Sequence, residues 1–175
     1  MSNYISNKEL LQPIDGYIFR QSDPRASSLQ YGRFGRRLKN VGCGVVAMYN
    51  VGVRLKKPQS AAEVIRDAER LRMPWMFGLF GTKPKSLGKY FSARGFTMWM
   101  TTDSKVFRLL LKDADCAVIC TWNSKRSDGI HFFTILNDNG NLRALNQYCE
   151  DSATPFSESD IRGDRFISGY VFPRL

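Results

Sequence analysis

Apolar residues recur at helical spacing in the first two thirds of the chain and at strand spacing in the last third. A helical face repeats about every 3.6 residues and a strand face about every 2, and these periods are the primary signals for the two elements. The pattern predicts helices at 43–55, 60–71, 85–95 and 103–114. It predicts strands at 96–100, 115–122, 129–136, 141–148 and 165–172. Helices followed by an antiparallel sheet are typical of the α+β class.

Two of these helices begin with side chains that cap a helix. Ser60 precedes Ala-Ala-Glu, which indicates a capping box in which Ser60 and Glu63 each bond the backbone of the other. Asp103 stands before the last helix, where its carboxylate accepts hydrogen bonds from free N–H groups. In that helix the apolar spacing places three residues on the buried face, namely Val106, Leu109 and Leu110.

The strands at 129–136 and 141–148 are separated by the sequence NDNG at 137–140, a strong signal for a hairpin. Asn-Gly supports the positive φ angles that a tight turn between antiparallel strands requires. With the turn at 137–140, the numbers of paired residues add up to about 277. Asn146 is therefore expected opposite Ile130 or His131.

Two segments lack regular periodicity. Residues 1–40 are rich in turn-forming residues and are expected to be irregular. Residues 72–84 are apolar but interrupted by prolines and glycines, so we expect a loop. Its aromatic residues Trp75, Phe77 and Phe80 pack onto the core in the favoured interpretation and line a cleft in the alternative. The length of 175 residues fits one domain, 1–175, with an irregular part (1–40), a mainly helical part (43–113) and a sheet part (115–175).

The composition is that of a globular protein with a strong excess of positive charge. Hydrophobic residues make up 43% and charged residues 24%, which excludes disorder and collagen-like repeats. The net charge is +10, with 10 Lys and Arg against 3 Asp and Glu in residues 1–58 and 6 against 8 in residues 114–175. This excess of positive charge favours contact with a polyanion through basic residues of 1–113. The alternative interpretation is that the charge only keeps the protein soluble. No nucleic-acid-binding motif accompanies it.

Two signals bear on membranes and compartment. No apolar run approaches the ~20 residues that a membrane helix needs. The first residues lack the basic start and apolar stretch of a signal peptide. We therefore expect no membrane span and, from the missing leader, a cytoplasmic location.

The four cysteines do not read as a disulfide framework in a chain long enough to build a core. Cys116 and Cys120 lie four residues apart in an apolar strand, about 13 Å from each other and too far to bridge. A zinc site from Cys116, Cys120, His131 and Cys149 lacks any C-x-x-C spacing and is disfavoured. Three of the four cysteines are expected to be small core residues.

The remaining cysteine belongs to a set of residues that fit nucleophilic catalysis. Cys43 follows a loop and begins a helix, where free N–H groups and the helix dipole stabilise a thiolate. His131 is the one histidine of the chain and therefore its one imidazole base. It lies in a strand, where a structural role is the alternative. Asn146 follows across the hairpin, and a side-chain amide there can orient the imidazole.

The order of these residues resembles that of papain-like cysteine peptidases. The resemblance is strongest to the bacterial peptidases that process bacteriocin leaders (double-glycine peptidases) and to their stand-alone relatives. Its motifs are RQSDPR from Arg20, NVGCGVVAM from Asn40, the block at 81–95, GIHFFTIL at 129–136 and LNQY at 145–148. The resemblance implies a papain-like fold, with the nucleophile helix in the N-terminal part and an antiparallel sheet after it.

The resemblance also implies a role for each matching position. Cys43 is the nucleophile, and His131 is the general base and later the acid. Asn146 stands where close relatives usually have Asp, and it orients the imidazole. Gln21 stands where relatives carry the glutamine of the oxyanion hole, although Ala26 replaces the tryptophan of that motif. Two rivals remain open, Gln30 for the oxyanion hole and Asp138 for orienting the imidazole, the latter at a hairpin tip typical of a turn residue.

The implied activity is hydrolysis of peptide or amide bonds through a thioester, without metal or cofactor. The partner is then a peptide or protein substrate. Relatives fused to transporters cleave after paired glycines, but this chain has no transporter part, so that specificity is not carried over. Such relatives are often exported, so export is the alternative to a cytoplasmic location. The same fold also supports an inactive binding or effector protein that uses its basic surface, or an acyl or amide transferase.

Overall fold

The computed structural model of the chain describes residues 3–10, 16–123, 129–148 and 150–174. Its helices are α1 (Asn3–Leu10), α2 (Leu38–Val41), α3 (Cys43–Arg54), α4 (Ala61–Arg70), η1 (Trp75–Gly78), α5 (Leu87–Ala93), α6 (Ser104–Leu111) and η3 (Glu158–Asp160). Its strands are β1 (Gln30–Tyr31), β2 (Arg36–Arg37), β3 (Trp99–Thr101), β4 (Ala114–Trp122), β5 (Ile130–Asp138), β6 (Asn141–Leu145), β7 (Thr154–Pro155) and β8 (Phe166–Pro173). The predicted α+β class is confirmed.

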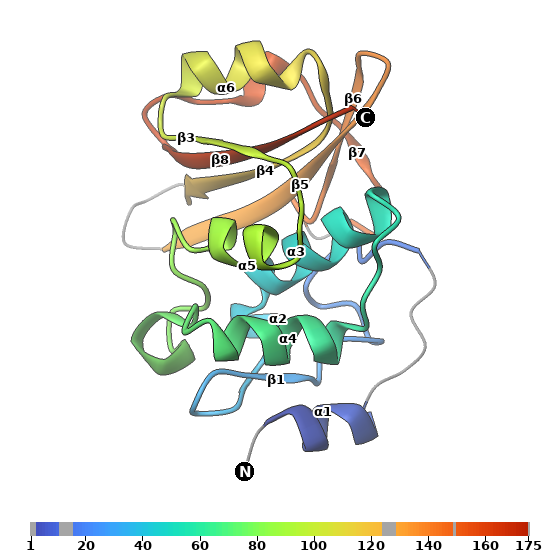
Figure 1. Cartoon of the computed structure of the whole chain (residues 1–175), viewed down its shortest axis with the longest axis vertical. Helices are drawn as coiled ribbons and strands as arrows, with labels where there is room; N and C mark the ends of the chain where they lie inside the picture. The colour runs from blue at the N-terminus through green and yellow to red at the C-terminus, as the bar shows by residue number, and fades with distance from the viewer. Residues whose placement is uncertain (1–2, 11–15, 124–128, 149, 175) are drawn as a thin grey trace.

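One antiparallel sheet of six strands, in the order β3-β8-β4-β5-β6-β7, forms the C-terminal part. Figure 1 shows α6 on one face of this sheet, with α3, α5 and α4 on the other and α1 at the far end of the molecule. A large apolar cluster fills the side of α3, α4 and α5, and a smaller one lies under α6. Among the described residues, no helix combines the length and apolar character needed to cross a membrane.

Helix α3 occupies the centre of the larger cluster and is buried from Cys43 to Gly52. On one side it contacts β5, where the Thr134 hydroxyl donates to the Ala47 carbonyl at 3.5 Å. On the other side the Asn50 side chain accepts from the Ile18 N–H and donates to the Ile18 carbonyl, at 2.9 and 2.8 Å. These bonds satisfy a buried amide and hold the helix between the sheet and the N-terminal segment.

The local signals for helix ends are confirmed. Ser60 precedes α4, its hydroxyl accepts from the Glu63 N–H at 3.3 Å, and the Glu63 carboxylate accepts from the Ser60 N–H at 2.9 Å. Asp103 caps α6 by accepting from the N–H groups of Lys105 and Val106. Short-range hydrogen bonds of this kind depend on neighbouring residues only, so the sequence reveals them.

The predicted buried face of α6 is wrong. Phe107 and Leu111 are buried, whereas Val106 and Leu109 are 42% and 64% exposed. The Phe107 ring lies over Gly169 in β8, and a β-carbon at Gly169 would come within 2.1 Å of that ring. The missing side chain of a residue far along the chain therefore selects which stripe of the helix meets the sheet.

The hairpin between β5 and β6 is confirmed, but its predicted register is wrong by two. Asp138 pairs with Asn141 and Thr134 with Leu145, so paired numbers add up to 279. The turn contains Asn139 and Gly140, both with positive φ, instead of the whole of 137–140. Two-residue turns of this kind match the right-handed twist of the strands. The ladder ends at Leu145, so Asn146 lies just beyond it.

Two non-periodic segments hold more structure than expected. Residues 3–10 form α1, whose Asn7 side chain bonds both backbone groups of Gln30 at 2.8 and 2.6 Å. The loop after α4 is closed at its base by a Pro74–Thr82 bridge, so the residues between them project. Phe77 and Phe80 are 58% and 62% exposed, which contradicts their predicted packing onto the core.

Candidate active site

Cys43 is the first residue of α3 and is almost completely buried. Its two flanking glycines are required by close packing. A β-carbon at Gly42 would lie 2.3 Å from Leu38, and one at Gly44 would lie 2.6 Å from the Thr82 hydroxyl. The Gly-Cys-Gly sequence therefore lets the helix begin against two neighbouring segments, with free N–H groups beside the sulfur.

His131, near the start of β5, is hydrogen-bonded to the Cys43 thiol. Its ring also stacks on Phe133, with 6.3 Å between ring centroids. β5 packs against α3, so the sheet carries the imidazole to the N-terminus of the helix.

The two groups change each other's protonation. Burial raises the pKa of the Cys43 thiol, but the hydrogen bond and charge of His131, with bonds from the backbone of Phe132 and Gly44, lower it further than burial raises it. Burial lowers the pKa of His131, and the bond to Cys43, its charge and the backbone of Asn146 together raise it. Both directions favour a thiolate beside an imidazolium.

Asn146 contacts His131 through its backbone. The Asn146 carbonyl oxygen is hydrogen-bonded to Nε2 of His131. Its side chain points elsewhere: Oδ1 accepts from the Gln21 N–H at 2.7 Å, and Nδ2 donates to the Phe132 carbonyl at 3.2 Å. The residue has a φ of 64°, a left-handed conformation that Asn adopts more readily than most residues. The structure thus brings Cys43, His131 and Asn146 together, with main chain in the place expected for a side chain.

Gln21 lies beside this group, bound to Asn146 by its backbone. Its side-chain amide donates to the Lys39 carbonyl at 2.8 Å, one turn before Cys43. Its Oε1 is buried and has no hydrogen-bond partner in the part of the chain that the structure describes. To turn toward a ligand, this side-chain amide has to break one hydrogen bond, the bond to the Lys39 carbonyl.

The two rival residues lie in other parts of the fold. Gln30 pairs with Arg37 in the small sheet of β1 and β2, where α1 binds its backbone. Asp138 ends β5 and forms ion pairs with Arg54 and Arg143, at 2.8 and 2.6 Å. Gln30 and Asp138 thus have structural partners of their own.

The other cysteines behave as core residues. Cys116 and Cys120 are buried, unbridged residues of β4. Burial raises the pKa of both thiols far above the ordinary value, so they stay protonated. No group of three metal-binding side chains occurs among the described residues. Cys149, the fourth member of the disfavoured zinc set, lies outside them.

Comparison with known proteins rests on structure alone. No protein-family model matches the sequence, and no curated protein matches it. The structure matches the peptidase domain of Streptococcus ComA, a bifunctional ABC transporter involved in a quorum sensing pathway, with a TM-score of 0.52. The match covers 75% of this chain and 91% of that domain at 14% identity. The fold is that of a papain-like peptidase domain. The resemblance inferred from the motifs is confirmed at the level of the fold.

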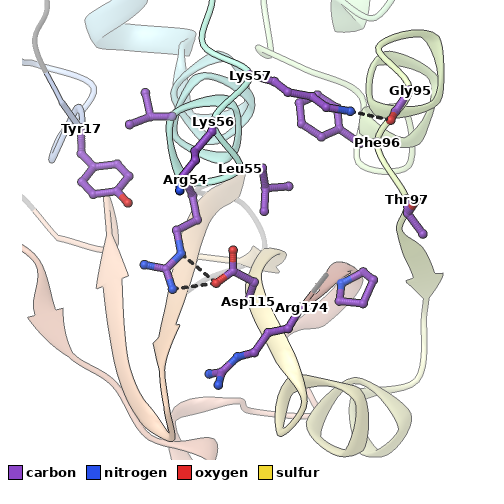
Figure 2. A pocket seen from close by; sticks show the side chains of 12 residues that line it. Tyr17, Arg54, Leu55, Lys56, Lys57, Gly95, Phe96, Thr97, Asp115 and Arg174 are labelled. Atoms are coloured by element: carbon purple, nitrogen blue, oxygen red, sulfur yellow. Dashed lines mark hydrogen bonds and ion pairs between the residues drawn. The ribbon is translucent and has the colours of Figure 1, made fainter.

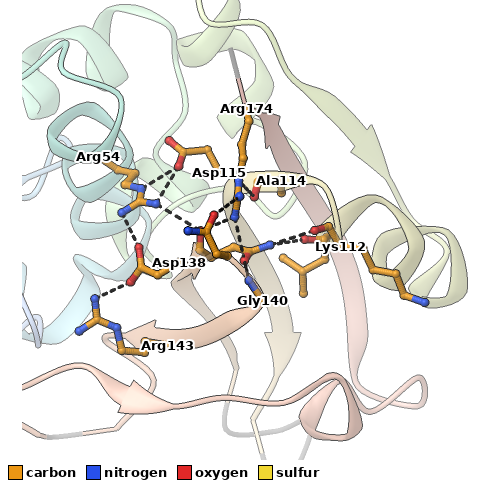
Figure 3. Close-up of polar contacts among 11 residues, drawn as sticks. Arg54, Lys112, Ala114, Asp115, Asp138, Gly140, Arg143 and Arg174 are labelled. Carbon is orange, nitrogen blue, oxygen red and sulfur yellow. Dashed lines mark hydrogen bonds and ion pairs between the residues drawn. The ribbon is translucent and has the colours of Figure 1, made fainter.

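One feature that links α3 to the sheet was not predicted from the sequence, an arginine at the far end of the helix from Cys43. Arg54 forms ion pairs with Asp115 of β4 at 2.7 Å and with Asp138 of β5 at 2.8 Å (Figure 3). Arg174 joins the same network through the Asn137 carbonyl and side chain. From the sequence, an arginine in the last turn of a helix predicts only a favourable interaction with the helix dipole. Its carboxylate partners could not be predicted, because they lie 61 and 84 residues away in the chain.

A cavity of about 600 Å³ opens beside this end of α3. Figure 2 shows Arg54, Lys56 and Lys57 at its edge, with Tyr17 and Phe96 on either side. Arg54 already has two carboxylate partners, and Lys57 donates to the Gly95 carbonyl at 2.9 Å. Neither Cys43 nor His131 lines this cavity, which is therefore separate from the thiol–imidazole pair.

Proposed function

We propose that the protein is a cysteine peptidase that hydrolyses peptide or amide bonds with Cys43 as nucleophile. The observation that carries this proposal is the buried thiol at the N-terminus of α3, hydrogen-bonded to the chain's one imidazole on a papain-like fold. A lowered thiol pKa and a raised imidazole pKa are what an activated cysteine requires, and the other two described cysteines have the opposite shift.

The reaction begins with attack of the Cys43 thiolate on the carbonyl carbon of the scissile bond. The negative charge that develops on the carbonyl oxygen is stabilised by the Cys43 N–H and by the Gln21 amide, once that amide leaves the Lys39 carbonyl. Protonated His131 then gives its proton to the leaving amine, which departs and leaves a thioester on Cys43. His131, now neutral, removes a proton from water, and the hydroxide releases the acid and restores the thiolate.

In this scheme Asn146 is a positioning residue. Its carbonyl holds Nε2 of His131, which leaves Nδ1 to face the sulfur, and its side chain ties the ring's strand to the segment that carries Gln21. The bond from the Gln21 N–H to Asn146 supports the choice of Gln21 over Gln30, whose strand is bound to α1.

The test that needs no known substrate is alkylation of the native protein with iodoacetamide at about pH 6, followed by mass-spectrometric mapping. An ordinary thiol, with a pKa of about 8.5, is largely protonated at that pH and reacts slowly. We expect fast labelling of Cys43, little labelling of Cys116 and Cys120, and a large loss of the Cys43 rate in His131→Ala. Equal and slow labelling in both proteins would contradict the proposal.

Two controls make the result specific. His131→Ala should lose less than about 3 kcal/mol of the free energy of unfolding, because the residue lies near the end of a strand and is only partly buried. Thr121→Ala changes the residue that pairs with His131 on β4 and should leave the labelling rate unchanged. A peptide library assayed by mass spectrometry, with added amines, then separates hydrolysis from acyl transfer, and Cys43→Ala must abolish either product.

A further inference from the structure

Five large apolar side chains form one exposed surface, which we call the apolar lobe: Phe34, Met76, Phe77, Leu79 and Phe80. They are between 39% and 62% exposed. Two loops contribute to the lobe, the β1–β2 hairpin and the loop after α4, and Figure 1 places both near the end of the molecule that carries α1. Soluble monomers seldom leave so many large apolar groups together in water, so the lobe indicates a contact surface.

The two loops of the lobe are joined by direct contacts. The Arg33 N–H donates to the Phe77 carbonyl at 2.8 Å, and the rings of Phe34 and Phe77 meet edge to face at 6.1 Å. Met76 and Phe77 both have positive φ, a costly conformation for such residues. The fold therefore presents these side chains at the tips of paired loops instead of burying them.

Cations surround the lobe. Arg33, Arg72 and Lys83 line a cavity of about 670 Å³ together with Met76 and Phe77. The Arg33 guanidinium lies 5.7 Å from the centre of the Phe77 ring. Among the described residues that line this cavity, the one carboxylate is Glu69, and it is occupied by the Asn3 side chain and the Gly32 N–H. The surface is thus apolar at its tips and positive around them.

Positive charge is also concentrated in the half of the molecule that carries the apolar lobe. The described residues of 3–58, which carry 10 Lys and Arg against 2 Asp and Glu, lie mainly in the half that holds the apolar lobe. The described residues of 114–174, with 4 against 7, lie mainly in the other half. A molecule with this separation turns its lobe toward an extended negative surface, because the attraction acts on many charges at once.

We propose that the apolar lobe docks on the surface of a lipid bilayer that contains anionic phospholipids. Aromatic side chains favour the boundary between headgroups and acyl chains, and arginine and lysine beside them bind the phosphates. Each phenylalanine that leaves water raises the partition coefficient by about tenfold or more, and each cation near the surface by about fivefold. Thr82, which follows the lobe, packs against Gly44, so docking places the Cys43 site near the bilayer.

The test is co-sedimentation with phosphatidylcholine vesicles, with and without phosphatidylglycerol, at an ionic strength of about 0.15 M. We expect binding to the mixed vesicles and much weaker binding to pure phosphatidylcholine. The triple variant Phe34→Ser/Phe77→Ser/Phe80→Ser should lower the partition coefficient at least about tenfold. Arg33→Gln/Arg72→Gln should lower it by an order of magnitude or more at low salt and by less at high salt.

The molecule offers a matched control at its other end. Trp99, Val106 and Leu109 on β3 and α6 are 48%, 42% and 64% exposed, so the triple variant Trp99→Ser/Val106→Ser/Leu109→Ser removes a similar apolar area. Its partition coefficient should not change. Equal losses in the two triple variants, or no binding of the wild type to the mixed vesicles, would overturn the proposal. Binding of a soluble acidic peptide to the lobe, together with no binding of the vesicles, would also overturn it.

A second measurement shows which end of the molecule faces the bilayer, and it needs no substitution in the apolar lobe. Trp75 adjoins the lobe through Phe80, with 6.0 Å between ring centroids, whereas Trp99 lies on β3. Brominated lipid in the vesicles should quench tryptophan fluorescence of the wild type and of Trp99→Phe, and much less of Trp75→Phe. Quenching that disappears in Trp99→Phe and persists in Trp75→Phe would place the bilayer at the opposite end and overturn the proposal.

Discussion

Asn146 connects three parts of the site through different atoms. Its carbonyl holds the imidazole, its Oδ1 holds the backbone of Gln21, and its Nδ2 holds the carbonyl of Phe132. An Asp in its place would keep the acceptor toward Gln21 but lose the donor toward Phe132. The left-handed backbone sets the direction of the carbonyl, so the conformation of the residue matters as much as its chemical type.

We predict that Asn146→Gly is more stable than Asn146→Ala by about 1 kcal/mol. Both variants lose the side-chain bonds, but only Ala pays for the left-handed conformation, which costs about 1–2 kcal/mol. Urea unfolding measures the difference. Asn40, an exposed residue of helix α2, is the control, and there Gly should be the less stable variant. The same order at both positions would contradict a left-handed backbone at Asn146.

At the same scale, the thiol–imidazole pair predicts a pH profile. A lowered pKa keeps the Cys43 thiolate present as the pH falls below the ordinary thiol value of about 8.5. The rate of alkylation of Cys43 should therefore stay high through neutral pH and decline only in more acidic solution. In His131→Ala the inflection should move up toward 8.5. A wild-type inflection at 8.5 or above would be the contrary result.

At the scale of elements, two kinds of contact fix the helices. Capping acts within a few residues, as at Ser60 before α4, and long-range ion pairs act between elements, as from Arg54 to β4 and β5. The first kind sets where a helix begins, and the second joins a helix to the sheet. The position of Cys43 relative to His131 depends on long-range contacts, namely the apolar packing of α3 together with these ion pairs, because the two residues sit on different elements.

Ser60→Ala should lower the free energy of unfolding by about 1 kcal/mol, because the Glu63 N–H loses its acceptor. The urea midpoint measures this loss. Ser92→Ala, at an exposed position inside α5, should leave the midpoint unchanged or slightly raised. The Cys43 labelling rate should be the same in both variants, since α4 holds no residue of the site.

Arg54→Gln should destabilise the protein by about 1–3 kcal/mol at neutral pH, because two carboxylates lose a charged partner that is mostly buried. Hydrogen bonds from Arg143 and Arg54 lower the pKa of Asp138. The stabilisation by ionised Asp138 is present above the unfolded pKa of about 3.9 and is lost as the pH falls through the lower native value.

The difference between wild type and Arg54→Gln should therefore narrow below about pH 4, as followed by urea unfolding across pH. Arg162→Gln breaks an exposed pair with Asp164 and should leave the urea midpoint unchanged at every pH. A difference for Arg54→Gln that stays constant down to pH 3 would show that its ion pairs do not stabilise the fold.

At the scale of the whole molecule, the apolar clusters lie on both faces of one sheet. If residues 1–175 form the predicted single domain, the protein should unfold in one cooperative transition. Thermal unfolding followed by far-ultraviolet circular dichroism, by tryptophan fluorescence and by exposure of Cys116 and Cys120 should give one coincident midpoint. Exposure of the cysteines at a lower temperature than the loss of helix signal would indicate two separately folding parts.

The sequence by itself determined the features that depend on short windows of residues. Helix starts at Ser60 and Asp103, the Asn-Gly turn and the change from helical to strand spacing are all of this kind, because caps, turns and periods involve neighbours. Cys43 and His131 could also be selected from the sequence as candidates for nucleophile and base, since Cys43 begins a helix after a loop and His131 is the one imidazole.

The tertiary structure decided everything that depends on which distant surfaces meet. The buried stripe of α6 follows from Gly169, 62 residues after Phe107, and the hairpin register follows from the two-residue turn together with packing on α3. The role of the Asn146 main chain, the tether from Arg54 and the projection of the loop after α4 have no local signal. Such contacts form between residues far apart in the chain, so their energies become visible only when the whole core is assembled.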